Sequence, residues 1–232
     1  MRKINLIIPA AGTSSRFKSS IPKQCQVING KTVLEHTLLA FSDSVLEDCI
    51  IAINKQTEET VCEIVKKIPF PVRVVMGGKT RAESVREAFF VAQKSDITLI
   101  HDAARMCLST SLIERIIEAS LHYDAVIPTI PVTDTIKKIH NDRVLQTLTR
   151  DDLVSVQTPQ AFKSALLRYA YEEYYDESIT DEASLIERAG KAVHIVKGDS
   201  HNIKVTHPID LEYVRSYMRK HYDDQSEDLP LK

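Results

Sequence analysis

The sequence predicts an α/β protein with a Rossmann-like, mostly parallel sheet flanked by helices and with an inserted β-hairpin arm. Short apolar runs alternate along the chain with segments whose apolar residues recur at helical spacing, a pattern typical of a sheet covered by helices on both faces. The runs are nearly continuous in Ile and Val, as in strands buried on both faces. One region breaks the alternation with two strand-like stretches around a turn.

The elements can be assigned in chain order from these periodicities. The expected strands are 4–8, 49–53, 72–76, 97–100, 125–127, 192–196 and 203–205. The expected helices are 33–41, 58–67, 82–93, 111–121, 163–171, 181–189 and 208–217. We expect residues 1–222 to form one domain, followed by a polar, frayed tail over 223–232.

The break in the alternation lies at residues 131–157. Stretches 134–139 and 144–149 are strand-like, and Asn141-Asp142 between them is a turn signal. A projecting ribbon leaves strand edges unpaired and usually needs a partner surface. We therefore predict a homodimer that uses this arm, although a hairpin folded back on its own domain fits the pattern equally well.

Composition excludes several classes of protein. With 232 residues, 43% hydrophobic and 27% charged, the chain is typical of a globular protein rather than a disordered, collagen-like or disulfide-stapled one. A net charge of −2 gives no overall attraction to nucleic acid or to an anionic membrane, so neither is an expected partner. The four cysteines lack metal-site spacing, and no apolar run suits a signal peptide or a membrane span. We expect a cytoplasmic protein.

The loop after the first strand is the first candidate site. Pro9-Ala10-Ala11-Gly12 is made of small residues that let backbone N–H groups approach a phosphate chain. It lacks the three-glycine dinucleotide pattern, and no Walker A motif is present. Arg16 and Lys23 follow, and such cations suit phosphoryl or nucleotidyl transfer, which needs charge stabilisation more than a nucleophile. The alternative is a pair of solvated surface cations.

Three further strand ends carry polar residues. Gly77-Gly78-Lys79 opens a helix, and a helix start is a natural anion site. Asp102 follows a buried strand and is a candidate Mg²⁺ ligand, or alternatively a turn or helix cap. Arg105 would bind a second phosphate or pair with Asp102. Lys204 lies in an otherwise apolar stretch, which is unusual for a lysine.

Taken together, these motifs resemble one family. The matching blocks, in order, are Pro9-Ala10-Ala11-Gly12 with Arg16, Pro22-Lys23-Gln24, Gly77-Gly78 with Arg81 and Ser84-Val85, His101-Asp102-Ala103-Ala104-Arg105, Pro131-Val132 with Asp134-Thr135-Ile136-Lys137, Gln157-Thr158-Pro159-Gln160 with Phe162, Thr180-Asp181, and Gly198-Asp199 with Asn202-Ile203-Lys204. The chain resembles the 2-C-methyl-D-erythritol 4-phosphate cytidylyltransferases of the non-mevalonate isoprenoid pathway, from Pro9 to about Leu211.

This resemblance implies an activity and assigns residues to it. The enzyme would transfer a cytidylyl group from CTP to 2-C-methyl-D-erythritol 4-phosphate and release pyrophosphate. The implied CTP-binding residues are Pro9, Ala10, Ala11, Gly12, Gly78, Lys79, Ser84 and Ala103. The implied catalytic residues are Arg16, Lys23, Arg150 and Lys204. The implied acceptor-binding residues are Arg105, Thr135, Arg150, Thr158, Thr180 and Lys204. Asp102 would be associated with Mg²⁺, and Arg150, on the hairpin, would reach the neighbouring subunit's active site.

The chain departs from the family pattern at three positions. Ser14 stands where a second glycine is usual, Met106 where proline is usual, and His201 where an acidic residue is usual. Two other functions stay open. One is a cytidylyltransferase for another polyol phosphate such as ribitol 5-phosphate, and the other is a catalytically silent nucleotide-binding scaffold. An NAD-dependent dehydrogenase has little support, because the dinucleotide motif is absent.

Overall fold

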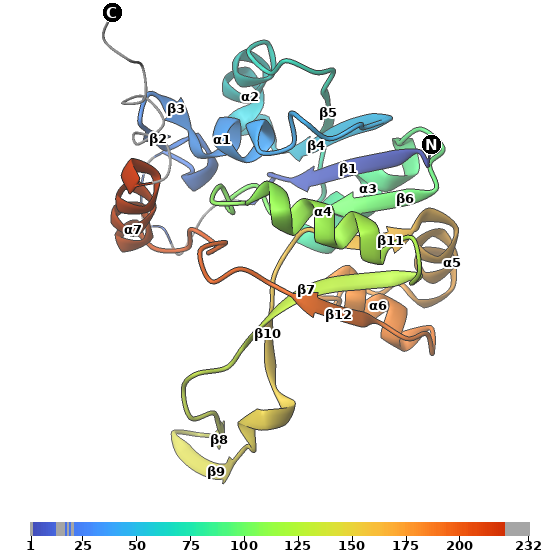
Figure 1. The fold of residues 1–232 in the computed structure, drawn as a ribbon, viewed down its shortest axis with the longest axis vertical. Coiled ribbons are helices and arrows are strands. Elements are labelled where there is room, and N and C mark those ends of the chain that lie inside the picture. The colour runs from blue at the N-terminus through green and yellow to red at the C-terminus, as the bar shows by residue number, and fades with distance from the viewer. Residues whose placement is uncertain (1, 13–16, 18, 20, 221–232) are drawn as a thin grey trace, which may run out of the picture.

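The computed structural model describes residues 2–12, 17, 19 and 21–220. In this part of the chain, eight strands form one central sheet with the order β10-β7-β11-β6-β1-β4-β5, and β12 pairs with the other edge of β7 (Figure 1). The strands of this sheet are β1 (Ile4–Pro9), β4 (Asp48–Ile53), β5 (Arg73–Met76), β6 (Ile97–Ile100), β7 (Ala125–Pro131), β10 (Val154–Val156), β11 (Gln160–Lys163) and β12 (His194–Lys197). A short ladder of β2 (Val27–Ile28) and β3 (Lys31–Thr32) lies outside it.

The predicted mostly parallel α/β fold is confirmed. β1 runs parallel to both β4 and β6, β4 is parallel to β5, and β7 is parallel to β12. Ile7 of β1 pairs in register with Ile50 and Ile100, so all three strands end at the same edge of the sheet. The loops that follow β1 and β6 therefore meet there.

One strand assignment from the sequence is wrong, and the strand β11 was not predicted. This strand, at residues 160–163, lies antiparallel between β6 and β7. The helix predicted over 163–171 follows it as α5 (Ser164–Tyr174). Strand β11 is too short for its periodicity to be recognised. Residues 203–205, expected as a strand, form no ladder: the Val205 N–H donates to the Ala104 carbonyl in a loop contact.

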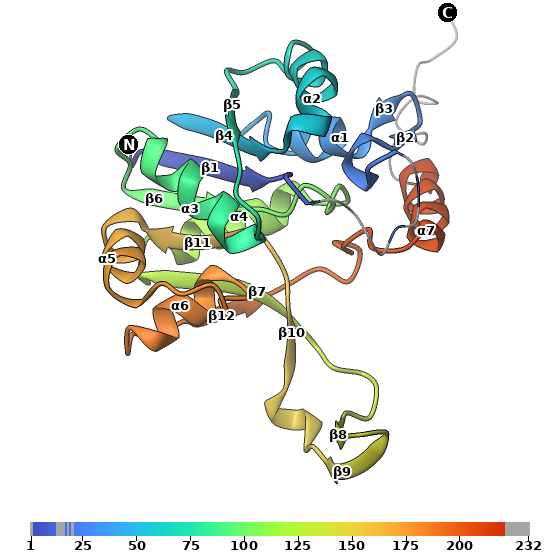
Figure 2. The ribbon, with the colours of Figure 1, turned by 180° about the vertical axis from the view of Figure 1, so that it is seen from behind.

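Helices cover both faces of the sheet, as predicted. They are α1 (Val33–Leu39), α2 (Glu58–Val65), α3 (Arg81–Val91), α4 (Thr110–Ala119), α5 (Ser164–Tyr174), α6 (Glu182–Arg188) and α7 (Pro208–Met218). Leu6 and Ile8 of β1 pack toward α1, α2 and α4, whereas Ile7 packs toward α3, α5 and α6. The two opposite views show these layers (Figures 1 and 2). This alternation explains why most positions of the inner strands β1, β4 and β6 are apolar.

A third apolar cluster holds α7 against the loop after β6. Met106, which stands where the family pattern has proline, is buried in this cluster together with Val205, Leu211 and Met218. The side chain therefore contributes to packing beneath the loop that carries Asp102. None of the described helices is both long and apolar enough to cross a membrane.

The predicted hairpin is present as β8 (Lys137–His140) and β9 (Arg143–Thr147), paired antiparallel. Asn141 and Asp142 both have positive φ, 44° and 62°, which is the backbone of a two-residue hairpin turn. The ribbon projects away from the sheet rather than folding back on it (Figures 1 and 2). Ile139 on this ribbon is 65% exposed. The dimer built on this arm stays a prediction.

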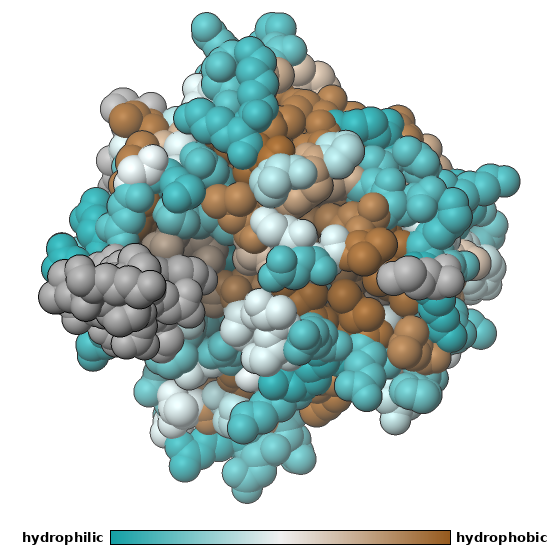
Figure 3. Space-filling model, turned by 45° about the horizontal axis from the view of Figure 1, so that its top comes forward, coloured by the Kyte–Doolittle hydropathy of each residue, from teal (hydrophilic) through white to brown (hydrophobic). Residues whose placement is uncertain are grey.

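The surface of one face is mixed in character. Hydrophilic side chains occupy most of its outline, and apolar side chains are grouped toward its middle (Figure 3). A cavity of about 330 Å³ lies at the amino ends of β1 and β6, where Ile4 and Ile97 face Ile113 and Ile117 of α4. It lies at the opposite ends of these strands from the polar loops described next.

Candidate active site

A cavity of about 370 Å³ opens at the carboxyl ends of β1 and β6. Four regions far apart in the sequence supply its walls: the described part of residues 9–24, and residues 78–84, 102–104 and 204–206. They contribute Pro9, Ala10, Ala11, Gly12, Phe17, Lys23, Gln24, Gly78, Lys79, Thr80, Arg81, Ser84, Asp102, Ala103, Ala104, Lys204 and Thr206. The parallel register of β1 and β6 brings two of these regions together.

The loop after β1 is held from both sides through its backbone. The Ala10 N–H donates to the Ala52 carbonyl at 2.7 Å, and the Gln24 side-chain amide donates to the Ala10 carbonyl at 2.8 Å. Asn54 Nδ2 donates to the Ala11 carbonyl at 2.8 Å. These bonds leave a loop of small side chains in a defined conformation along the cavity wall.

The glycine pair after β5 lies directly against this loop. A Cβ atom added to Gly77 would stand 2.9 Å from Ala11 Cβ and 2.7 Å from Ser84 Oγ, closer than side-chain carbons approach. A glycine is therefore needed at residue 77 for the two loops to meet. Gly78 and Lys79 then continue along the cavity wall.

Helix α3 begins at the cavity. The Thr80 hydroxyl accepts a hydrogen bond from the Glu83 N–H at 3.0 Å and so caps the helix. Buried Ser84 donates to the Thr80 carbonyl at 2.8 Å. The first turn of a helix presents N–H groups and a partial positive charge, which suit an anionic ligand.

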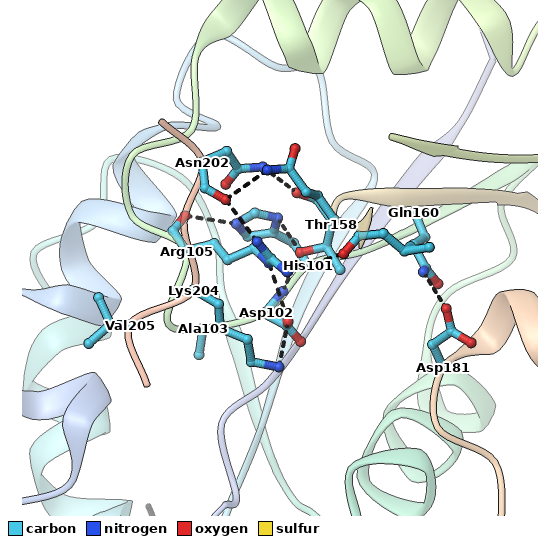
Figure 4. Close-up of polar contacts among 12 residues, drawn as sticks. His101, Asp102, Ala103, Arg105, Thr158, Gln160, Asp181, Asn202, Lys204 and Val205 are labelled. Atoms are coloured by element: carbon cyan, nitrogen blue, oxygen red, sulfur yellow. Dashed lines mark hydrogen bonds and ion pairs between the residues drawn. The ribbon is translucent and has the colours of Figure 1, made fainter. Parts of the chain in front are cut away.

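Asp102 is the centre of a cluster of cations on the cavity floor. Its Oδ1 accepts from Arg81 Nε at 3.0 Å, and its Oδ2 lies 2.8 Å from Lys204 Nζ and 3.5 Å from Arg105 Nε. Figure 4 shows Lys204 reaching the carboxylate from a separate stretch of chain. Burial by itself would raise the pKa of Asp102, but Arg81, Lys204 and Arg105 together lower it well below its usual range. The carboxylate therefore stays ionised.

His101 and Thr158 support Asp102 from beneath (Figure 4). The Thr158 hydroxyl accepts from the Asp102 N–H at 3.0 Å and lies 3.1 Å from His101 Nδ1. His101 Nε2 is 3.1 Å from the Arg105 carbonyl, which can only accept, so this nitrogen carries the proton. Burial lowers the pKa of His101 to about 4, and the ring is neutral at ordinary pH.

Two of the three lysines that line the cavity, Lys23 and Lys204, are connected to the segment 202–206. Lys23 Nζ donates to the Val205 carbonyl at 3.0 Å, and Lys204 belongs to the segment itself. Asn202, fully buried, donates through Nδ2 to the Thr158 carbonyl at 2.8 Å, and its own carbonyl accepts from Arg105 Nη1 at 2.8 Å. This segment is therefore fixed beside the strand ends even though it forms no ladder.

The structure brings most of the predicted CTP-binding and catalytic residues around this one cavity. The described residues that line it are Pro9, Ala10, Ala11, Gly12, Lys23, Gly78, Lys79, Ser84, Asp102, Ala103 and Lys204. Arg16 and Ser14 lie outside the described residues. The roles assigned to these residues stay predictions.

The predicted acceptor-binding residues, other than Lys204, do not line the cavity. Thr135, Arg150 and Thr180 are exposed, and Arg150 Nη1 donates to the Thr133 carbonyl at 2.8 Å on the arm. Thr158 is buried beneath Asp102. Arg105 contacts Asp102 but extends behind it, toward the Asn202 carbonyl.

Sequence reasoning missed several residues of the cavity, of which Arg81 is the most important. It connects Asp102 to Glu182 of α6, whose Oε2 accepts from Arg81 Nη1 at 2.9 Å. Arg81 directly follows the helix cap Thr80 and belongs to the glycine-pair motif, which is the signal that could have indicated it. Gln24 and Thr206 also line the cavity without having been assigned.

The residues that line the cavity can hold a divalent cation only if a bound substrate supplies some of the metal ligands. Asp102 is the single carboxylate among the described residues that line the cavity, and the described chain has no group of three His, Cys, Asp or Glu side chains placed to hold a metal. Mg²⁺ is commonly held by one or two carboxylates together with substrate phosphates. Asp199 is not a second ligand here: its carboxylate accepts from Ser109 and from the His201 N–H.

Comparison with known proteins identifies relatives along nearly the whole chain. Residues 4–220 match the family IspD, 2-C-methyl-D-erythritol 4-phosphate cytidylyltransferase. A Bacillus cytotoxicus protein named 2-C-methyl-D-erythritol 4-phosphate cytidylyltransferase is 38% identical over 218 residues, covering 92% of this chain and 96% of that protein. A protein of the same name from Alteromonas mediterranea is 37% identical over 231 residues, covering 97% of each.

Solved structures are similar over the same extent. The crystal structure of 4-diphosphocytidyl-2C-methyl-D-erythritol synthase from Anaerococcus prevotii superposes with a TM-score of 0.82 at 32% identity, covering 94% of this chain and 99% of that one. The bifunctional IspDF from Campylobacter jejuni gives a TM-score of 0.77 at 26% identity, covering 90% of this chain and 53% of that longer one.

Proposed function

Because the chain belongs to the 2-C-methyl-D-erythritol 4-phosphate cytidylyltransferase family, we propose that the cavity at the carboxyl ends of β1 and β6 is its active site. The enzyme transfers the cytidylyl group of CTP to 2-C-methyl-D-erythritol 4-phosphate. The products are 4-diphosphocytidyl-2-C-methyl-D-erythritol, an isoprenoid precursor, and pyrophosphate. The observation that carries this assignment is the convergence of Arg81 and Lys204 on the Asp102 carboxylate, in a cavity that Lys23 and a small-residue loop also line.

The chemistry needs no nucleophile from the protein. A phosphate oxygen of the acceptor attacks the α-phosphorus of CTP, a new P–O bond forms, and the bond to the β-phosphate oxygen breaks. Negative charge accumulates around the α-phosphorus, and preorganised cations stabilise it. We assign this task to Lys23 and Lys204, together with Arg16.

CTP binding belongs to the two loops that meet at Gly77. Pro9 to Gly12 and Gly78-Lys79 supply backbone close to a triphosphate, and Ser84 and Ala103 complete this side of the cavity. Small side chains and a helix N-terminus are what such a ligand requires.

Mg²⁺ would be held between Asp102 and the phosphates of the nucleotide. When bound, it would neutralise phosphate charge and orient the triphosphate. The ionised state of Asp102 suits this task, because the surrounding cations keep the carboxylate deprotonated. Lys204 would exchange its contact with Asp102 for a phosphate oxygen.

The acceptor site requires a second copy of the chain. Thr135 and Arg150 are exposed on the arm, and in a homodimer they would contact the acceptor in the partner's cavity. Arg105 and Thr180 would complete the site from the same protomer. Thr158 supports the site indirectly, because its buried hydroxyl already contacts Asp102 and His101. A cytoplasmic location is part of this proposal.

Pyrophosphate release tests the function directly. The protein is incubated with CTP, Mg²⁺ and either 2-C-methyl-D-erythritol 4-phosphate or ribitol 5-phosphate, and pyrophosphate is measured over time. We expect turnover with the methylerythritol acceptor and little with ribitol phosphate. Turnover only with ribitol phosphate would make the chain a different cytidylyltransferase. CTP binding without any turnover would make it a scaffold.

A further inference from the structure

We propose that Glu182 is a positioning residue for this reaction: its buried carboxylate holds the Arg81 guanidinium against Asp102 and so keeps Asp102 oriented toward the cavity. The inference rests on the proposed function and extends it to a residue outside the cavity. Glu182 does not line the cavity, and it acts through Arg81.

The position of Glu182 is set by the sheet. Glu182 is the first residue of α6, and Asp181 before it caps the helix by accepting from the Ser184 N–H at 3.1 Å. Gln160 of β11 donates to the other oxygen of Asp181 at 2.8 Å, a contact visible in Figure 4. The start of α6 is thereby attached to the strand that lies beside β6. Glu182 is thus placed relative to the loop that carries Asp102.

Glu182 is connected to the cavity through Arg81 and Asp102. Its side chain is 0% exposed, and Oε2 accepts from Arg81 Nη1 at 2.9 Å. The Tyr171 hydroxyl donates to Oε1 at 3.3 Å. Arg81, with its side chain 25% exposed, lines the cavity and donates from Nε to Asp102 Oδ1 at 3.0 Å. Two edges of one planar guanidinium therefore connect the two carboxylates.

This arrangement is a costly way to stabilise a fold. A buried ion pair gains little over well-packed apolar residues, because both charges lose their hydration. It does, however, orient a planar guanidinium and prevent it from turning toward a phosphate. In this cluster three cations, Arg81, Arg105 and Lys204, face two carboxylates, Asp102 and Glu182. Glu182 therefore also limits the positive charge beneath the nucleotide.

Removing the charge of Glu182 should change the CTP affinity, the Mg²⁺ requirement and kcat, each in a defined direction. In Glu182→Gln, Arg81 loses a charged partner, and among the described residues Asp102 is the only carboxylate left to it. The guanidinium is then held in place less firmly, so Asp102 is oriented less well and becomes a poorer metal ligand. The cavity also gains net positive charge. We expect CTP to bind about two- to tenfold more tightly in the absence of metal. The reason is that the added positive charge attracts the triphosphate, although the protein and solvent between them weaken this attraction. The Mg²⁺ concentration for half-maximal activity should rise severalfold, and kcat should fall.

The experiment combines binding and kinetics. Metal-free CTP binding is measured by titration calorimetry, and kcat, the CTP KM and the Mg²⁺ dependence are measured by pyrophosphate release. Glu187→Gln is the matched control, because it makes the same chemical change on the exposed part of the same helix. The control should match the wild type in every measurement.

The possible results separate the alternatives. Tighter metal-free CTP binding with a raised Mg²⁺ requirement supports the inference. A lowered melting temperature with CTP binding and Mg²⁺ dependence like those of Glu187→Gln overturns it, because a merely structural residue would behave in that way.

If Glu182→Gln does not fold, Glu182→Asp replaces it. That variant keeps the charge but shortens the reach, so we expect wild-type metal-free CTP affinity with a lower kcat. A wild-type kcat would overturn the inference. Failure of the wild-type enzyme to turn over any acceptor would instead reject the proposed function, and the metal-free CTP titration would still test the role of Glu182.

Discussion

Lys23 and Lys204 reach the cavity with their ammonium groups already held. Lys23 donates to the Val205 carbonyl, and Lys204 pairs with Asp102 at 2.8 Å. Both ammonium groups are therefore fixed at the cavity before the substrate arrives, and for Lys204 the contact with Asp102 has to be exchanged for one with a phosphate oxygen. Preorganisation of this kind explains how a cavity without a protein nucleophile can catalyse the transfer.

We expect Lys23→Ala to lower kcat by about a hundred- to a thousandfold, because loss of one preorganised donor costs about 2–4 kcal/mol of transition-state stabilisation. Steady-state pyrophosphate release measures the change. Thermal unfolding should show a near-normal melting temperature, and Lys191→Ala, at an exposed residue, is the control. Near-normal turnover of Lys23→Ala would exclude Lys23 from this role.

His101 predicts a pH dependence of stability. Burial lowers its pKa to about 4 in the folded protein, whereas an unfolded histidine titrates near 6.5. The unfolded chain therefore takes up a proton first, and the free energy of unfolding should decrease as the pH falls from about 6.5 toward 4. The full contribution is about 3 kcal/mol.

Chemical denaturation at several pH values measures this effect. The decline should be shallower in His101→Gln, because that variant has no imidazole to protonate. The control is His140→Gln, a substitution at an exposed residue of β8. This variant should keep the wild-type slope. Equal slopes in both variants would contradict the assignment.

Among the structural elements, the two loops at Gly77 depend most on each other. The loop after β1 carries Ala11, and the loop after β5 leads into α3 and Ser84. Each loop follows a parallel strand of the same sheet. Their close approach shapes the wall on which we place CTP.

Gly77→Ala should therefore separate these loops. The added methyl group would meet Ala11 and Ser84 at 2.7–3.0 Å, and such overpacking costs about 1–3 kcal/mol of folding free energy. Urea denaturation measures the loss, and the KM for CTP should rise as well. Gly12→Ala serves as the control for stability, because nothing lies within 4 Å of its added methyl group. Equal stabilities of the two variants would show that the loops are not in this contact.

At the scale of the whole molecule, the arm and the cavity belong to different parts of one protomer. Arg150 is exposed on the arm and does not line the cavity of its own chain. Apolar side chains on the ribbon, including Ile139, Val144 and Leu145, are also exposed. An exposed apolar ribbon of this kind favours pairing with another surface. A symmetric dimer would cover it and deliver Arg150 to the partner's cavity.

Mixing two inactive variants tests this arrangement. Lys23→Ala and Arg150→Ala should each lose most activity alone. When they are unfolded together and refolded, about a quarter of all sites should have both an intact Lys23 and an intact Arg150 from the partner chain. Activity should return to about that fraction.

Sedimentation of the wild type should give the mass of a dimer. No recovery of activity from a mixture that does form dimers would mean that each site is completed within one chain. A monomer in sedimentation would reject the arm as a dimerisation element.

The local sequence determined the elements of the first half of the chain. The strands near 4–8, 49–53 and 97–100 were predictable because strands buried on both faces are nearly continuous runs of apolar residues. The turn at Asn141-Asp142 was recognisable because these residue types tolerate positive φ. The family motifs also placed Lys23, Asp102 and Lys204 among the candidates that share the cavity.

Only the tertiary structure decided how these residues are connected. Arg81 and Glu182 are 101 residues apart, and Asp102 and Lys204 are also distant in the chain. The periodicity of a single segment cannot predict these ion pairs, because they form only when segments distant in sequence meet at one edge of the sheet. The same is true of β11, whose short run becomes a strand only because β6 and β7 leave a place between them. Hydrogen bonds and ion pairs between distant segments depend on the folded arrangement. The pattern of buried and exposed positions within a segment, in contrast, follows from the order of apolar and polar residues in that segment alone.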